Sequence, residues 1–170
     1  MAQQYRVAAI KATGSVSPND RSDLQATGAT YVKDFSDYGF PSTYRVASSR
    51  LQSLVGTMLA DAMDSEPHMV VVELADGVLQ QETLSLLETP WLRRLVAGAV
   101  LAAPCALSAL KGIEVIERSG VNVVGVSGCI ANAPLFADEL NKYSKYSVLS
   151  TPETLACAAI ARQQSICRAA

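Results

Sequence analysis

The chain has 170 residues, of which 49% are hydrophobic and 18% are charged, and a domain of this length buries roughly 70% of the surface that its unfolded chain exposes. The 14 Lys and Arg residues nearly balance 16 Asp and Glu residues, and neither sign forms a long run, so the sequence lacks the basic patch of a nucleic-acid-binding protein. The longest apolar stretch, 95–110, contains Pro104 and is shorter than the ~20 residues of a membrane span.

Strand-like and helix-like segments alternate along the chain. In chain order the first half predicts a strand over 5–10, a brief helix over 22–27, a strand over 31–35, a helix over 49–63 and a strand over 69–74. The second half predicts helical segments over 78–87 and 91–95, a strand over 97–103, a helix over 107–116, a strand over 122–127, a helix capped by Asn132, a strand over 146–149 and a helix starting at Thr151.

This alternation predicts an α/β fold with a mostly parallel, doubly wound, Rossmann-like sheet of about six strands and helices on both faces. We find no repeat and no linker, so the expected organisation is a single domain over 1–170. The run Met69-Val-Val-Val72 has no polar alternation, which is typical of a strand buried on both faces. We therefore expect 70–74 to be a central strand with a parallel neighbour on each side and with Val71 buried.

The cysteines and the first residues indicate a cytoplasmic protein. The four cysteines show no C-x-x-C pair and no metal-binding spacing, and their apolar or small neighbours predict buried, reduced thiols. The chain begins Met-Ala-Gln-Gln-Tyr-Arg with no apolar core behind it, so no secretory signal is visible. The four positions are Cys105, Cys129, Cys157 and Cys167.

Polar residues follow the predicted strands at their carboxyl ends, where parallel sheets bind ligands. They are Lys11, Asp34 with Asp37, Glu73 with Asp76, and Ser127 with Gly128. Lys11 could neutralise a phosphate or carboxylate while Thr13 and Ser15 donate hydrogen bonds. Glu73 or Asp76 could hold a divalent cation, since such cations take oxygen ligands.

A structural alternative stays open at each of these positions. Lys11 could be a solvated strand end, and Asp34 and Asp37 could be turn and cap residues. Glu73 is the hardest to explain structurally, because it interrupts an apolar run and an unpaired buried charge is costly. Tyr44 could line a ligand site or hold its loop in place.

Three segments resemble a group of P-loop proteins related to dethiobiotin synthetase. They are Lys11-Ala-Thr-Gly-Ser15, Asp34-Phe-Ser-Asp-Tyr-Gly-Phe-Pro-Ser-Thr-Tyr44 and Val72-Glu-Leu-Ala-Asp-Gly-Val-Leu-Gln-Gln-Glu-Thr83. The resemblance implies a nucleotide-binding domain that uses ATP and Mg²⁺. It implies catalytic roles for Lys11, Glu73 and Asp76, and a magnesium-binding role for Glu73 and Asp37.

The same resemblance implies further binding residues. Those for the nucleotide are Thr13, Ser15, Ser127, Gly128 and Asn132. Those for the second substrate are Asp34, Asp37, Thr43 and Tyr44.

The sequence differs from these P-loop proteins in one respect. It contains no G-x-x-x-x-G-K-[ST] loop, whose backbone N–H groups and lysine anchor the phosphates. We therefore expect that this chain alone is not an independent NTPase, and that an ATP-dependent ligase-like or hydrolase-like activity would need a partner segment carrying the loop.

Three functional hypotheses follow. The first is an α/β domain that binds a small anionic ligand and associates with a second copy or a loop-bearing partner. The second is a non-catalytic binding or interaction module on the same fold. The third is a small-molecule enzyme that uses the carboxylates for acid–base chemistry.

Overall fold

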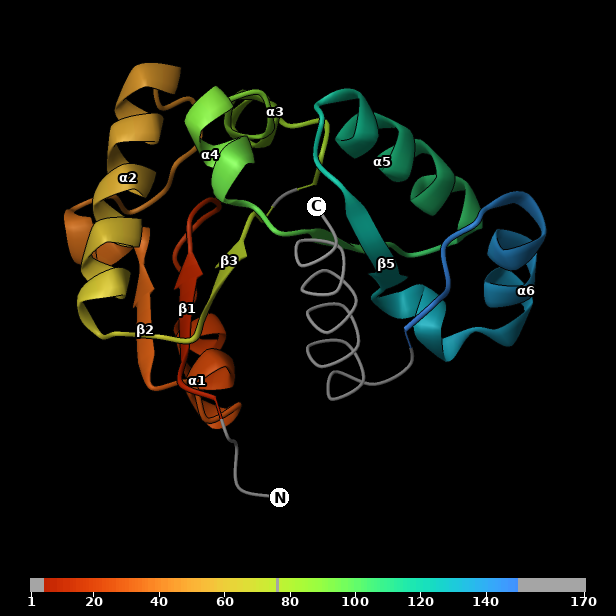
Figure 1. The fold of residues 1–170 in the computed structure, drawn as a ribbon, viewed down its shortest axis with the longest axis horizontal. Coiled ribbons are helices and arrows are strands. Elements are labelled where there is room, and N and C mark those ends of the chain that lie inside the picture. Colours follow the sequence, from red (N-terminus) through yellow and green to blue (C-terminus); the bar gives the residue numbers. More distant parts are fainter. Residues whose placement is uncertain (1–4, 76, 150–170) are drawn as a thin grey trace, which may run out of the picture. The chain divides into compact units, whose positions relative to one another are not determined.

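A computed structural model describes residues 5–75 and 77–149 of the chain. It divides into two compact units, Met1–Leu86 and Leu87–Ala170, which are considered separately below (Figure 1). The expectation of a single domain stays a prediction. The helix expected from Thr151 lies outside the described residues, as do Asp76, Cys157 and Cys167.

The first unit is built around a three-stranded parallel sheet (Figure 1). Its elements are β1 (Val7–Lys11), α1 (Pro18–Ala26), β2 (Tyr31–Asp34), the 3-10 helix η1 (Phe35–Tyr38), α2 (Ser48–Asp64), β3 (Met69–Glu73) and α3 (Gln81–Leu87). The strand order is β2-β1-β3, so β1 is the central strand. All three strands run in the same direction, and their carboxyl ends therefore meet at one edge of the sheet.

The expectation that residues 70–74 form a central strand is wrong for this sheet. β3 pairs only with β1 in the described residues, and the side chain of Val71 is 44% exposed. The buried central strand is β1, where Ala8, Ala9 and Ile10 are at most 3% exposed. An apolar run favours burial on both faces, but it does not reveal how many strands pair with the segment or what covers it.

Helix α2 covers the sheet with a regular apolar face. Its buried residues follow the 3.6-residue period of a helix, because Leu51, Leu54, Val55, Met58 and Ala62 return to the same side every three or four positions. Helix α2 contacts all three strands. The helix expected over 49–63 is confirmed, although Met63 at its end is exposed.

The second unit contains a two-stranded parallel sheet with helices. Its elements are α4 (Pro90–Leu95), β4 (Ala99–Ala102), α5 (Ala106–Arg118), β5 (Val123–Ser127), the 3-10 helix η2 (Cys129–Asn132) and α6 (Pro134–Tyr143). Strand β4 pairs with β5, and the segment expected as a strand over 146–149 makes a single parallel bridge from Val148 to Val126. The α/β class with parallel strands is thus confirmed. The described residues contain five short strands in two small sheets, and one doubly wound sheet of about six strands stays a prediction.

Two local expectations in the second unit are wrong. Asn132 does not cap α6, because it is the last residue of η2 and the cap position is occupied by Ala133. Pro134 begins the helix instead, since its fixed backbone angle suits the first helical turn. The cysteines are not uniformly buried either: Cys129 is exposed and Cys105 is intermediate, because both follow strand ends rather than face a core.

Candidate functional site

A row of charged residues crosses the carboxyl edge of the sheet in the first unit. Lys11 is the register partner of Asp34 on one neighbouring strand and of Glu73 on the other. Residues in register on parallel strands point to the same face of the sheet. Folding therefore places the basic residue Lys11 between two acidic residues, Asp34 and Glu73, although the three are far apart in the chain.

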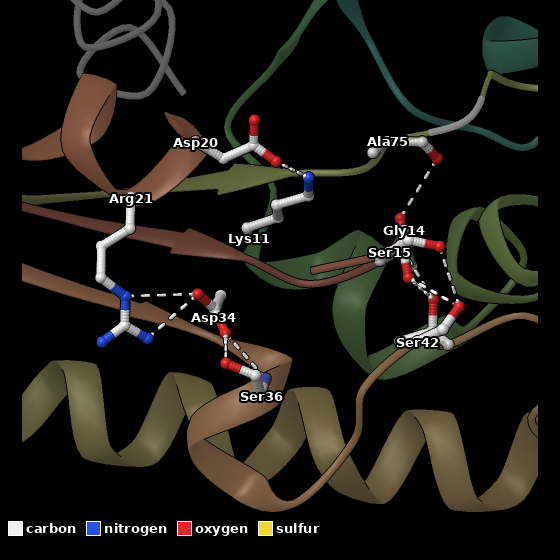
Figure 2. Close-up of polar contacts among 11 residues, drawn as sticks. Lys11, Gly14, Ser15, Asp20, Arg21, Asp34, Ser36, Ser42 and Ala75 are labelled. Atoms are coloured by element: carbon white, nitrogen blue, oxygen red, sulfur yellow. Dashed lines mark hydrogen bonds and ion pairs between the residues drawn. The ribbon is translucent and has the colours of Figure 1, made fainter. Parts of the chain in front are cut away.

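Lys11 is buried and paired. Only 7% of its surface is exposed, and its Nζ forms an ion pair with the Asp20 carboxylate of α1 (Figure 2). The interpretation of Lys11 as a solvated strand end is therefore wrong. An ammonium group is rarely buried without a partner, and Lys11 has two acidic neighbours, Asp20 and Glu73.

Glu73 is partly buried beside this lysine. Burial raises the pKa of its carboxyl group, nearby Lys11 lowers that pKa, and Asp20 raises it again, so that the pKa lies above its ordinary value. One cation is thus shared by two carboxylates. A carboxyl group with a raised pKa exchanges its proton closer to neutral pH than an ordinary glutamate does.

Asp34 and Asp37 are held by a cation of the protein. Arg21 Nη2 lies 3.0 Å from Asp34 Oδ2 and 2.5 Å from Asp37 Oδ2. Burial alone would raise the pKa of Asp34, but hydrogen bonds from Ser36 and Arg21 outweigh burial and hold that pKa below its ordinary value (Figure 2). Lys33 adds a second, longer ion pair to Asp37, at 3.6 Å.

The contacts of Asp34 and Asp37 favour a structural role. Asp34 caps η1 by accepting from the Ser36 backbone N–H at 2.7 Å, and the Asp37 carboxylate accepts in return from the Asp34 backbone N–H at 3.0 Å. This reciprocal capping box satisfies donors at the start of the 3-10 helix. Asp37 pairs with Arg21 and Lys33, and its expected role in holding Mg²⁺ together with Glu73 stays a prediction. Within residues 5–75 and 77–149, no group of three His, Cys, Asp or Glu side chains could hold a metal ion.

Buried threonines connect the loops that follow β1 and β3. The hydroxyls of Thr13 and Thr83 both donate to the carbonyl oxygen of Ala75, each at 3.3 Å. Thr13 is 1% exposed and Thr83 is 2% exposed. Their shared acceptor fixes the chain just beyond Glu73 against the chain just beyond Lys11.

A second set of contacts holds the loop that contains Thr43. The Gly14 backbone N–H donates to Thr43 Oγ1 at 2.8 Å, and the Thr43 backbone N–H donates to the Gly14 carbonyl at 2.9 Å. Ser15 and Ser42 lie side by side, with their hydroxyl oxygens 3.2 Å apart (Figure 2). Thr13, Ser15 and Thr43, predicted separately from two motifs, thus share one loop cluster.

Tyr44 lies in the same loop and is exposed, and its neighbour Arg45 is held by a buried acid. Tyr44 is 66% exposed, so its ring does not hold the loop by packing. The Arg45 backbone N–H donates to the carboxylate of Glu82, which is 8% exposed. Arg45 and Glu82 were not predicted from the sequence.

The remaining predicted residues belong to the second unit. Ser127 Oγ donates to the Leu149 carbonyl at 3.2 Å. Gly128 turns the chain after β5 with a φ of +91°, and a Cβ there would lie 2.9 Å from the Ala103 backbone nitrogen. Asn132 ends η2. These three residues follow the end of β5, where Gly128 forms a tight turn.

The structure thus brings Lys11, Thr13, Ser15, Thr43 and Glu73 to one edge of the first unit. Sequence reasoning missed the charged partners on α1, Asp20 and Arg21. Their adjacent positions in the first turns of a short helix gave no periodic or motif signal, because ion pairs depend on where the helix packs.

No protein-family model matches the chain, and no curated protein matches it. Among the described residues, no helix is both long enough and apolar enough to span a membrane.

Proposed function

We propose that this chain is an α/β domain that binds a small anionic ligand at the carboxyl edge of β1 and β3, with Lys11 as the cation that meets the ligand. The burial of Lys11 between two carboxylates carries the proposal. A buried lysine at the end of a central parallel strand is costly to desolvate, and this position is the usual place for ligands in such sheets. A nucleotide is the ligand implied by the resemblance to dethiobiotin synthetase-like P-loop proteins.

The ligand would replace Asp20 as the partner of Lys11. Asp20 lies on α1, a nine-residue helix with no buried residues. Because α1 buries so little, its displacement costs few packing contacts. The loops that follow β1 and β3 are already joined, since the buried Thr13 side chain donates a hydrogen bond to the Ala75 carbonyl. Glu73, with its raised pKa, can take or give a proton beside the bound anion.

The chain acting alone would bind a nucleotide weakly and would not hydrolyse it. The 170 residues contain no Gly-Lys-Ser or Gly-Lys-Thr, so the backbone cradle and lysine of a P-loop are not supplied by this sequence. A partner segment bearing such a loop, or a second copy of the chain, would complete a catalytic site.

A titration of the purified chain with millimolar ATP and Mg²⁺, followed by backbone NMR shifts, tests this function. We expect shifts for residues 11–15 and 73–75, loss of those shifts in Lys11→Met, and no phosphate release above the buffer blank. Lys33→Met is the matched control, since Lys33 belongs to the same sheet but is 42% exposed at its side chain and pairs with Asp37. Unshifted wild-type spectra would contradict anion binding, and phosphate release that Lys11→Met abolishes would contradict the absence of hydrolysis.

The alternative is a non-catalytic interaction module on the same fold. The contacts of Asp34 and Asp37 favour it, because both predicted ligand-binding acids are occupied by Arg21 and by the cap of η1. Under this alternative Lys11→Met lowers stability without changing the binding of any anion.

A further inference from the structure

Arg45 has a backbone conformation that its side chain does not favour. Its φ is +58°, in the left-handed region, where residues other than glycine are uncommon. Such a conformation persists only where the surroundings impose it, and it occurs often at ligand-binding sites. At Arg45 the backbone N–H is held by the carboxylate of Glu82.

Glu82 is a buried acid that faces a backbone donor. It lies in the first turn of α3 and is 8% exposed, and its carboxylate accepts from the Arg45 backbone N–H. A hydrogen bond to a buried charged acceptor is stronger than one between neutral groups. Glu82 therefore holds the Arg45 backbone in place.

The Arg45 guanidinium has no acidic partner among the described residues. Its only described contact is with the ring of Tyr44, with Cζ 5.2 Å from the ring centroid. The other cations along this edge, Lys11 and Arg21, each pair with aspartates. An anion that reaches this edge therefore meets one cation whose charge is not already neutralised by the protein.

Hydrogen bonds made by the neighbours of Arg45 and Glu82 connect this pair to the loops of the proposed ligand site. Thr43, two residues earlier, exchanges two hydrogen bonds with Gly14, which follows Lys11 by three residues. Glu82 is followed by Thr83, whose hydroxyl shares the Ala75 carbonyl with Thr13. Arg45 and its partner Glu82 are thus both connected, through neighbouring residues, to the loops that follow β1 and β3.

We propose that Arg45 binds the carboxylate or phosphate group of the ligand, and that Glu82 is the positioning residue that aims it. This inference rests on the anion-binding function proposed above and identifies the Arg45 guanidinium as the group that selects the anion. The planar guanidinium can donate two parallel hydrogen bonds to either a carboxylate or a phosphate, with the exposed Tyr44 ring beside it.

Calorimetric titration of the full chain with inorganic pyrophosphate and, separately, with succinate tests the proposal and distinguishes the two anions. We expect wild type to bind one of them, and Arg45→Asn to weaken that binding by about tenfold or more, the loss typical of a hydrogen bond to a charged group. Asparagine tolerates a positive φ, so the loop should keep its shape. Arg45→Lys keeps the charge without the planar pair of donors and should recover part of the affinity.

Arg50→Gln is the matched control, because the Arg50 guanidinium also stacks on a ring, that of Phe40 at 4.7 Å, but its backbone is helical and no acid in the described part of the chain accepts a hydrogen bond from it. It should bind the anion as wild type does. For Glu82, Glu82→Gln keeps an acceptor oxygen and should retain affinity, whereas Glu82→Leu should lose it. Their melting temperatures, measured in parallel without anion, separate lost positioning from lost folding.

The outcomes separate the two proposals. If wild type binds neither anion, the anion-binding function fails and this inference fails with it. If wild type binds but Arg45→Asn binds equally well, or Arg50→Gln is weakened as much as Arg45→Asn, only the role of Arg45 is overturned. If Glu82→Leu keeps wild-type affinity while folded, Glu82 is not the positioning residue.

Discussion

Lys11 and Glu73 are register partners on adjacent parallel strands, although 62 residues separate them in the chain. Their side chains share one face at the carboxyl edge of the sheet, and Asp20 approaches the same lysine from α1. The lysine therefore has two acids to stabilise, and the two acids repel one another. This arrangement determines what substitutions at the three positions should do.

Glu73→Gln should leave the free energy of unfolding at pH 7 unchanged or increased. The pKa of Glu73 is raised in the folded state, so folding favours the protonated form and its ionisation opposes folding. The stability that protonation of Glu73 contributes is fully present below the pKa of Glu73 in the unfolded chain. It is lost as the pH rises through the pKa of Glu73 in the folded chain. The gain from glutamine should therefore disappear in acid. Denaturant unfolding at several pH values measures this, with the exposed Glu66→Gln as control.

A large loss of stability in Glu73→Gln at pH 7 would instead identify Glu73 as one partner of a structural ion pair. Removing one partner of a fully buried pair costs ~3–5 kcal/mol.

Lys11→Met should destabilise the fold, because it leaves Asp20 and Glu73 without their shared cation. The cost should stay below about 3 kcal/mol, since the Asp20 side chain is 32% exposed and water screens its charge. Adding Asp20→Asn to Lys11→Met should recover part of the loss. A double-mutant cycle by urea unfolding measures the coupling, and additive effects of the two substitutions would contradict the pairing.

Asp34→Asn should lower stability at neutral pH by about 1 kcal/mol, a value discounted for the 36% exposure of the Arg21 side chain. Asparagine can still cap η1, so the substitution isolates the charge. The pKa of Asp34 is lowered in the folded state, so its stabilising effect is present above the ordinary pKa and is lost as the pH falls through the folded pKa. The difference between the variant and wild type should shrink in acid. Thermal unfolding between neutral and acidic pH tests this, and a constant difference would exclude the charge as its source.

Gly128→Ala should destabilise the chain by about 2 kcal/mol. The φ of Gly128 is +91°, and an added Cβ would lie 2.9 Å from the Ala103 nitrogen and 3.1 Å from the Ala103 oxygen. Gly56→Ala is the opposite case, because Gly56 is in the middle of α2 and, outside the helix's own nearby backbone, no described atom lies within 4 Å of its added Cβ. It should stabilise by up to about 1 kcal/mol. Denaturant midpoints of the two variants give the comparison, and equal effects would refute the backbone explanation.

The sequence by itself determined the α/β class, the parallel strands and the approximate positions of most elements, because these follow from local periodicity and from breaking residues such as Gly120. It also located Lys11, Thr13, Thr43 and Glu73 near strand ends or in loops. The tertiary structure decided which strand is central, since pairing depends on partners and not on the apolarity of one run. It also decided the partners of each charge: Asp20 and Arg21 on α1, and Glu82 behind Arg45, are brought in by packing. Burial and the register of parallel strands thus supply the contacts that no spacing along the chain encodes.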